Sequence, residues 1–166
     1  MKRDRLETPM LSIRPAILAD VPLLRELIQE LAEYEQEPNA VLLTEDQLRH
    51  DGFGPHPKFR VLIAELDEKP AGHAVFFPFY STWTGTSLFL EDLFVRERFR
   101  GHGVGKALFR RLAELAQKEG YPSIRLDVLD WNQPAIDFYK SLGADYLAQW
   151  RTVLLGPAAL TRLVRA

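Results

Sequence analysis

The segment 87–128 is the part of the chain that most tightly constrains its fold. Residues 87–95 are typical of a long strand, 96–103 of a glycine-rich connection, and 104–118 of an amphipathic helix with apolar positions at helical spacing. Residues 123–128 are typical of another strand. Two strands joined through a helix lie parallel, because the helix carries the chain back to the end where the first strand started. The sequence therefore predicts one parallel strand pair late in the chain.

The other elements place this pair in a mixed sheet. Short turns join the candidate strands at 60–66, 72–80 and 87–95, so these strands are expected to be antiparallel. Further strands are expected at 11–14 and at 146–154 (a strand or a hairpin), and helices at 21–34, 45–52, 134–142 and 158–164. The predicted fold class is α/β, with a mixed, mostly antiparallel central sheet and helices on both faces.

Capping residues mark several helix boundaries. Asp20 is expected to cap the first helix, which Pro38 is expected to close. Thr44 and Gln47 have the spacing of a capping box for the second helix. Gly120 fits the position that follows the long helix.

Length and composition indicate a single domain. The chain has 166 residues, 46% of them hydrophobic and 27% charged, which is enough to bury a core without disulfides. We expect residues 1–10 to be a disordered N-terminal extension and residues 11–166 to form one domain.

Charge and composition argue against several classes of protein. The net charge is −2 and no long basic run is present, so nucleic acid is not an expected partner. The chain has no cysteine and its four histidines lack ligand spacing, so no disulfide, thiolate nucleophile or metal is expected. A membrane-spanning helix needs about 18 consecutive apolar residues, and no apolar run in the sequence is close to that length. The charged N-terminus lacks the apolar region of a secretory signal. We expect a cytoplasmic location without membrane partners.

A glycine-rich turn carries the clearest chemical signal. It comprises Arg100, Gly101, His102, Gly103, Val104, Gly105 and Lys106, between a predicted strand and a predicted helix. Glycines let backbone N–H groups approach a phosphate, and the first turn of a helix is electropositive. The turn predicts an anionic ligand such as a pyrophosphate; the alternative is a tight turn that binds nothing. Its spacing fits neither a P-loop, since Ala107 follows Lys106, nor a dinucleotide fingerprint.

Several motifs in this order resemble one enzyme superfamily. The pattern Arg100-x-x-Gly103-x-Gly105 is similar to the acetyl-CoA pyrophosphate loop of GNAT N-acetyltransferases, and Asn132-Gln133-Pro134-Ala135 to their second cofactor segment. A closer resemblance, to the diamine (spermidine/spermine) and thialysine N-acetyltransferases, is carried by Ile13-Arg14-Pro15-Ala16, Leu31-Ala32-Glu33-Tyr34-Glu35, Asp51-Gly52-Phe53-Gly54, Tyr80-Ser81-Thr82-Trp83, Leu90-Glu91-Asp92 and Val128-Leu129-Asp130-Trp131-Asn132.

The resemblance implies an activity and a site. It implies acetyl transfer from acetyl-CoA, as co-substrate, to a primary amine of a small cationic metabolite, by an enzyme that forms a homodimer. Glu91 is implied as the base, acting through water, and Tyr139 as the acid. The implied cofactor contacts are the backbones of Leu93, Phe94 and Val95, the turn from Arg100 to Lys106, Asn132 to Ala135, and Tyr139. The implied substrate contacts are Tyr34, Glu35, Trp83, Glu91 and Asp92.

Some of these assignments have structural alternatives. Tyr139 is either the acid or a core aromatic beside Phe138. Glu91 and Asp92 are adjacent, so on a regular strand they face opposite sides, and one of them is alternatively a solvated rim charge. Four acidic residues share one helical face, which is either plain solvated surface or an acidic wall that attracts an amine: Glu26, Glu30, Glu33 and Glu37.

The function has two alternatives. In the first, the acetyl acceptor is a protein lysine or N-terminus instead of a small metabolite. In the second, the protein is an acetyl-CoA-binding sensor without turnover, an alternative that the presence of Glu91 and Tyr139 disfavours. The polyamine-acetylating members carry an acidic residue in the loop before the tryptophan, whereas the stretch from Tyr80 to Trp83 has no carboxylate. The resemblance therefore favours thialysine, lysine-like amino acids or short diamines over spermine.

Overall fold

The computed structural model describes residues 9–165, which fall into two compact units. The first unit ends at Asp127 and the second begins at Val128. The predicted disordered extension over residues 1–10 lies mostly outside the described residues. Within them, the Met10 N–H donates to Asp67 Oδ1 at 2.8 Å. The single domain over 11–166 stays a prediction.

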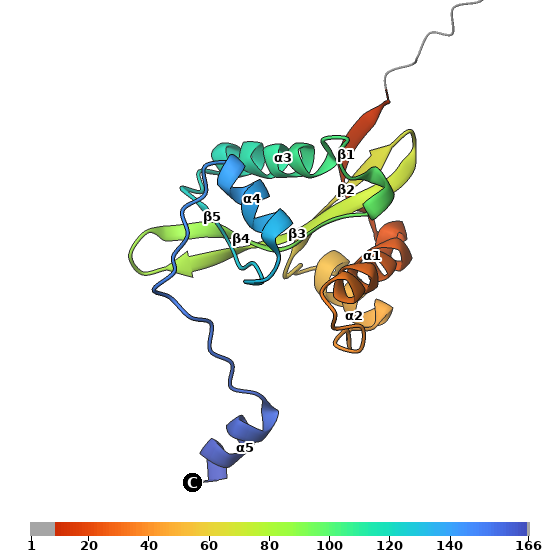
Figure 1. Cartoon of the computed structure of the whole chain (residues 1–166). Helices are drawn as coiled ribbons and strands as arrows, with labels where there is room; N and C mark the ends of the chain where they lie inside the picture. The colour runs from red at the N-terminus through yellow and green to blue at the C-terminus, as the bar shows by residue number, and fades with distance from the viewer. Residues whose placement is uncertain (1–8, 166) are drawn as a thin grey trace, which may run out of the picture. The chain divides into compact units, whose positions relative to one another are not determined.

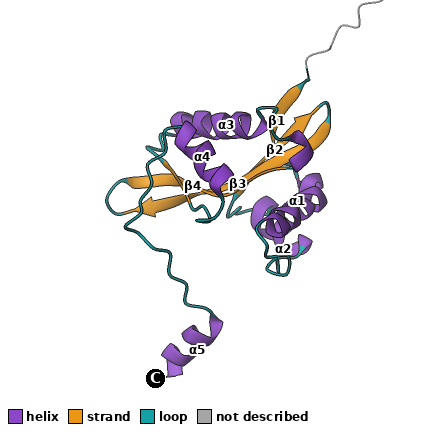
Figure 2. Ribbon diagram, viewed as in Figure 1, coloured by secondary structure: helices purple, strands orange, loops and turns teal. Residues whose placement is uncertain are grey.

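The first unit is built on a five-stranded sheet with the predicted mixed topology (Figures 1 and 2). Its strands, in spatial as well as chain order, are β1 (Leu11–Pro15), β2 (Arg60–Leu66), β3 (Lys69–Ser81), β4 (Gly85–Val95) and β5 (Ile124–Leu126). The first three pairings are antiparallel, and β5 is parallel to β4. The parallel pair that the sequence predicts is confirmed.

One face of the sheet is covered by α3 (Val104–Glu119), as Figure 1 shows. Leu108 and Leu112 of this helix are fully buried in one cluster with Phe76 and Leu90 of the sheet. Burying a leucine side chain contributes about 1.5–3 kcal/mol, so this seam fixes the helix that follows the glycine-rich turn. The left-handed backbone of Gly120, with φ of +76°, ends the helix as predicted.

The opposite face is covered by α1 (Val21–Tyr34) and α2 (Glu45–Phe53) (Figure 1). Leu24 and Leu48 are buried there with apolar residues of β2, β3 and β4. The predicted capping box of α2 is confirmed: the Gln47 N–H donates to Thr44 Oγ1 at 3.2 Å and the Thr44 N–H donates to Gln47 Oε1 at 2.9 Å.

Two predicted helix boundaries of α1 differ in the structure. The Asp20 carboxylate does not cap α1 but accepts hydrogen bonds from Arg14 and from the Ile17 N–H, in a 3₁₀ turn at Leu18–Asp20. Pro38 does not close α1, which ends at Tyr34 because Gln36 adopts a left-handed φ of 65°.

The second unit holds two helices, α4 (Gln133–Ser141) and α5 (Pro157–Arg165). The predicted strand or hairpin at 146–154 is wrong: this stretch is irregular, and Leu147, Trp150, Val153 and Leu154 are exposed. A strand is stable only with a partner, and residues 128–165 contain no other strand to supply one. Over the described residues, no helix is both long and apolar enough to span a bilayer.

Candidate active site

A β-bulge in the middle of β4 shapes the site. Val75 of β3 lies opposite Asp92, but the next residue, Phe76, lies opposite Leu90, so Glu91 has no partner in β3. Leu90 belongs to the core beneath α3, whereas Val75, opposite Asp92, belongs to the core beneath α1. Strand alternation is therefore broken at Glu91.

The bulge corrects the expectation that Glu91 and Asp92 face opposite sides of the sheet. Alternation up to Leu90 directs Glu91 to the α1 side, and the extra residue returns Asp92 to that same side. Two adjacent carboxylates thus share one face, beside the last residues of α1.

Three carboxylates form an acidic cluster at this place: Glu35, Glu91 and Asp92. Burial raises the pKa of Glu35, which lies just after α1, and the charge of Asp92 raises it further. Partial burial also raises the pKa of Glu91, with added repulsion from Asp92 and from Asp127 after β5. Like charges at short range disfavour ionisation of one another, so this cluster attracts a cation and holds a carboxylate that accepts a proton readily.

Beyond the bulge, β4 has an open edge. β5 pairs only with Leu88, Phe89 and Leu90, whereas β4 continues to Val95. In the described part of the chain, no strand pairs with residues 91–95 on the β5 side. Alternate residues of β4 direct their N–H and C=O groups away from β3, so this edge presents hydrogen-bonding groups to a ligand.

The glycine-rich turn follows directly from this edge. Gly101 and Gly103 have left-handed φ values of +78° and +77°, and a Cβ at either position would have no atom within 4 Å. The turn ends on the first residues of α3, whose N–H groups have no acceptor within the helix. Such a positive helix end, approached through residues without side chains, suits a phosphate group.

Arg100 links the turn to the acidic side of the site. Its Nε donates to Val95 O at 3.0 Å, and its guanidinium carbon lies 4.6 Å from the centroid of the Tyr34 ring. This cation–π contact contributes about 0.5–1 kcal/mol at an exposed site. The His102 ring Nδ1 lies 2.9 Å from Arg100 O, which gives the turn an internal hydrogen bond. Tyr34, Glu35 and the turn are therefore brought together.

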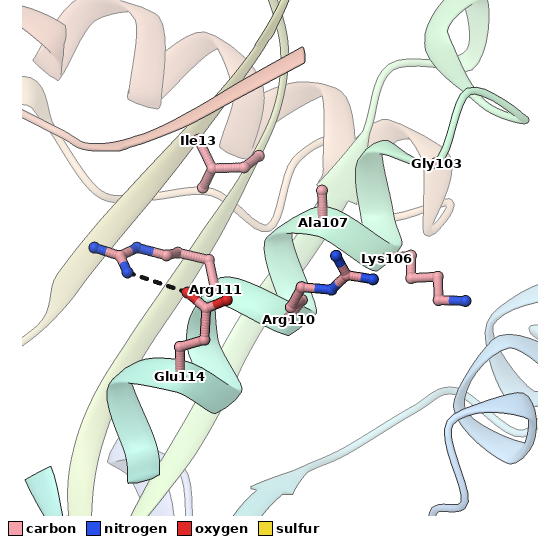
Figure 3. Close-up of a pocket in the computed structure, with 7 residues that line it drawn as sticks. All are labelled: Ile13, Gly103, Lys106, Ala107, Arg110, Arg111 and Glu114. Carbon is pink, nitrogen blue, oxygen red and sulfur yellow. Dashed lines mark hydrogen bonds and ion pairs between the residues drawn. The ribbon is translucent and has the colours of Figure 1, made fainter. Parts of the chain in front are cut away.

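A basic pocket of about 360 Å³ adjoins the start of α3 (Figure 3). Its lining is Ile13, Gly103, Lys106, Ala107, Arg110, Arg111 and Glu114. Arg111 donates to Glu114 at 3.2 Å, whereas Lys106 and Arg110 extend from successive turns of the helix (Figure 3). Their charges add to the positive end of α3, so the pocket suits additional anionic groups.

The acidic face of α1 has a structural role in part. Arg96, whose side chain is mostly buried, forms ion pairs with Glu30 at 2.7 Å and with Glu26, and also donates to Pro70 O at 3.2 Å. This arginine fastens α1 to the end of β4. Glu26 and Glu30 therefore match neither sequence-based alternative, because their charges are neutralised by an ion pair within the fold.

Other predicted residues lie elsewhere. Trp83 is at the tip of the β3–β4 hairpin and is 84% exposed. The strand from Gly85 to Glu91 spans about 20 Å at the usual rise per residue. Trp83 is therefore too far from Glu91 to contact an amine bound at the acidic cluster of the same chain. Phe94 is buried in the core, which leaves its backbone for the predicted contact.

The predicted acid and second cofactor segment belong to the second unit. Asn132 caps α4, because its Oδ1 accepts the Ala135 N–H at 3.3 Å, and Gln133 and Pro134 form the first turn. Tyr139 lies two turns further and packs edge to face against Phe138, with centroids 5.2 Å apart. The roles of these residues stay predictions.

Sequence reasoning missed two groups at the site. Asp127 follows β5, and no motif distinguishes it from other surface acids. His73 is fully buried in β3, 3.7 Å from Asp92. The signal that could have found His73 is a lone histidine within the otherwise apolar run from Ala71 to Phe77.

Comparisons with known proteins agree with this geometry. The sequence pattern of the acetyltransferase (GNAT) family matches residues 23–144. The chain is 41% identical over 145 residues to thialysine N-epsilon-acetyltransferase of Sus scrofa, covering 82% of this chain and 85% of that relative. It is 38% identical over 139 residues to spermidine/spermine N(1)-acetyltransferase-like protein 1 of Homo sapiens, covering 80% of this chain and 20% of that protein.

A solved structure shows the same fold. Aminoglycoside N-acetyltransferase AAC(6')-Iy in complex with CoA superimposes with a TM-score of 0.72 at 20% identity, covering 91% of this chain and 97% of that chain. The family pattern spans most of the chain, and the resemblance inferred from the sequence motifs is confirmed. The glycine-rich turn, the bulged β4 and these relatives lead to one conclusion: the chain belongs to the acetyltransferase (GNAT) family and is an enzyme that transfers acetyl to an amine.

Proposed function

We propose that this enzyme transfers acetyl from acetyl-CoA to the primary amine of a small cationic metabolite, with thialysine or a similar short amino acid preferred over spermine. The observation that carries the proposal is the bulge of β4, which gathers Glu35, Glu91 and Asp92 on one face beside an open strand edge. The acidic cluster suits an ammonium group, and the edge and the glycine turn suit an acyl carrier with phosphates.

The residues of the turn and of α3 fit acetyl-CoA. The left-handed Gly101 and Gly103 and the first N–H groups of α3 would hold the pyrophosphate. Lys106 and Arg110, on the pocket of Figure 3, would hold a further phosphate. The β4 backbone at Leu93, Phe94 and Val95 would hold the pantetheine arm, with Asn132 to Ala135 as the second cofactor segment.

Glu91 would make the amine reactive. An alkylammonium has a pKa of about 10, so it must lose a proton before its nitrogen can attack a thioester. The raised pKa of Glu91 makes this carboxylate a better acceptor for that proton, taken through a water molecule. Glu35 and Asp92 hold the ammonium beside it until the proton leaves.

Acyl transfer then completes the reaction. The amine nitrogen attacks the acetyl carbon, and an N–H of the β4 edge donates to the carbonyl oxygen as negative charge develops there. The nitrogen loses its second proton to solvent water, the carbonyl re-forms as the carbon–sulfur bond breaks, and Tyr139 donates its hydroxyl proton to the departing thiolate. Glu91 then releases its proton to solvent and Tyr139 regains one from it.

The choice of a short acceptor is supported by the local extent of the acidic cluster. Each ammonium of a long polyamine needs a counter-charge, and beyond Glu35, Glu91 and Asp92 the distant hairpin tip adds none, because Tyr80, Ser81 and Thr82 carry no carboxylate. A missing ion pair costs on the order of 1–3 kcal/mol, which corresponds to about a ten- to hundredfold loss of kcat/KM. The relative from Sus scrofa bears a thialysine acetyltransferase name.

A competition assay tests the acceptor. Thialysine, lysine, spermidine and spermine are mixed at equal concentration with acetyl-CoA, and the acetylated products are quantified by mass spectrometry. We expect thialysine to be acetylated at least about tenfold faster than spermine. A tenfold preference for spermine or spermidine would overturn the assignment of a short acceptor.

A further inference from the structure

His73 occupies an unusual position in the core of the first unit. It lies in the middle of β3, is fully buried, and faces Ile63 of β2 and Phe94 of β4 in the sheet register. Neither ring nitrogen has a hydrogen-bond partner among the described residues. A buried polar group without a partner costs about 1–3 kcal/mol, so a histidine here needs a reason beyond filling space.

The carboxylate of Asp92 lies close to the ring. Its Oδ2 lies 3.7 Å from His73 Nε2, just beyond hydrogen-bond distance, so a small side-chain rotation closes the gap. The two residues are diagonal neighbours on the α1 face, since His73 opposes Phe94 and Asp92 opposes Val75. His73 therefore lies behind Asp92, on its buried side.

Asp92 needs such a neighbour because of its surroundings. It interacts electrostatically with Glu35 from α1 and with Glu91 from the bulge, and both are acidic. Repulsion from both carboxylates favours rotation of Asp92 away from them. An N–H donor on the buried side would hold one carboxylate oxygen and leave the other directed at the substrate.

We propose that His73 is a positioning residue for amine recognition: its Nε2–H donates to Asp92 and fixes this carboxylate toward the substrate ammonium. This inference rests on the proposed function of the acidic cluster. It requires a proton on Nε2 and involves no proton transfer. His73 itself touches neither substrate nor cofactor.

Two substitutions separate this role from packing. His73→Phe keeps a ring beside Phe94 but removes the donor, whereas His73→Gln keeps a donor of similar reach. We expect His73→Phe to raise the KM for the amine about five- to tenfold and to leave the KM for acetyl-CoA within about twofold, with His73→Gln close to wild type. Ile63→Val, a core change opposite His73, serves as the control and should lower only the melting temperature. An unchanged amine KM in His73→Phe, or an equal loss in both His73 variants, would overturn the proposal.

A second measurement does not depend on turnover. NMR of the ring nitrogens should show His73 as the Nε2–H tautomer, and Asp92→Asn should alter its ring signals while those of His50, His56 and His102 stay unchanged. If Asp92→Asn left the ring signals of His73 unchanged, the hydrogen bond between His73 and Asp92 would be contradicted. A preserved pairing in an enzyme that acetylates no small amine would instead refute only the proposed function.

Discussion

Substituting Glu91 by glutamine removes the proposed base and keeps the shape of the side chain. A general base contributes about 10²–10⁴-fold, so turnover should fall by that factor, which corresponds to about 2.7–5.4 kcal/mol of activation free energy. The wild-type rate should fall as the pH drops through the pKa of Glu91, which burial and the charges of Asp92 and Asp127 place above its usual 4.5. This acidic limb should disappear in Glu91→Gln.

The fold should not suffer from the same change. A carboxyl group with a raised folded-state pKa is destabilising when ionised, so its stabilising effect is present only at low pH and is lost as the pH rises. At neutral pH, Glu91→Gln should therefore keep or raise the melting temperature. Initial rates from about pH 5 to about pH 9 provide the assay, with Glu97→Gln as an exposed control on the adjacent connection. Turnover within about threefold of wild type, with the acidic limb at the same midpoint, would refute the assignment of Glu91.

Three further predictions test other parts of the structure. Tyr139→Phe should lower kcat about 10²–10⁴-fold with a smaller effect on the KM for acetyl-CoA, and steady-state kinetics that show a loss under about threefold would leave Tyr139 as a packing residue. Gly103→Ala and Gly120→Ala place a Cβ on nearly the same left-handed backbone, at +77° and +76°, at opposite ends of α3. Both variants should lose about 1–2 kcal/mol of stability, but only Gly103→Ala should weaken CoA binding in calorimetry. Equal CoA affinities of the two variants would contradict the assignment of the turn as the pyrophosphate site. The Arg14 guanidinium lowers the pKa of Asp20, so the stabilisation by the Asp20 carboxylate is fully present above about pH 3.8 and is lost progressively as the pH falls below that value. Asp20→Asn should therefore cost about 1.5–3 kcal/mol in urea unfolding at pH 7 and less with each step below about pH 3.8, and a cost that does not change with pH would contradict the pairing.

Local signals predicted the framework of the fold well. The strand–turn–helix–strand order fixed β4 and β5 as a parallel pair, and the Thr44–Gln47 spacing located the start of α2. Both depend on interactions within a short stretch or on a general rule of chain handedness. The glycine-rich turn was also predictable, since its left-handed residues include Gly101 and Gly103.

Features that depend on distant partners could not be predicted. The bulge at Glu91 depends on the register of β3 against β4, which the run from Leu90 to Val95 does not encode by itself. Asp20 fits a helix cap by sequence, but Arg14 and the Ile17 N–H bind its carboxylate. The apolar stretch 146–154 fits a strand by composition but has no strand partner in its unit.

The candidate site shows the same division. Motifs located Tyr34, Glu35, Glu91 and Asp92, yet only the bulge explains why the two adjacent acids share a face. The sequence did not identify His73 as a site residue, because a single histidine in an apolar strand is usually a core residue. Its significance comes from burial and from Asp92, 3.7 Å away across the strand.

The most direct test of the central claim is thiol release from acetyl-CoA by the purified enzyme, measured with and without thialysine, together with the mass of the amine product. We expect slow release without the amine and saturable release with thialysine, in equal molar amount with N-acetylated product. Binding of acetyl-CoA with no amine-stimulated thiol release would contradict it and would indicate a cofactor-binding protein without turnover.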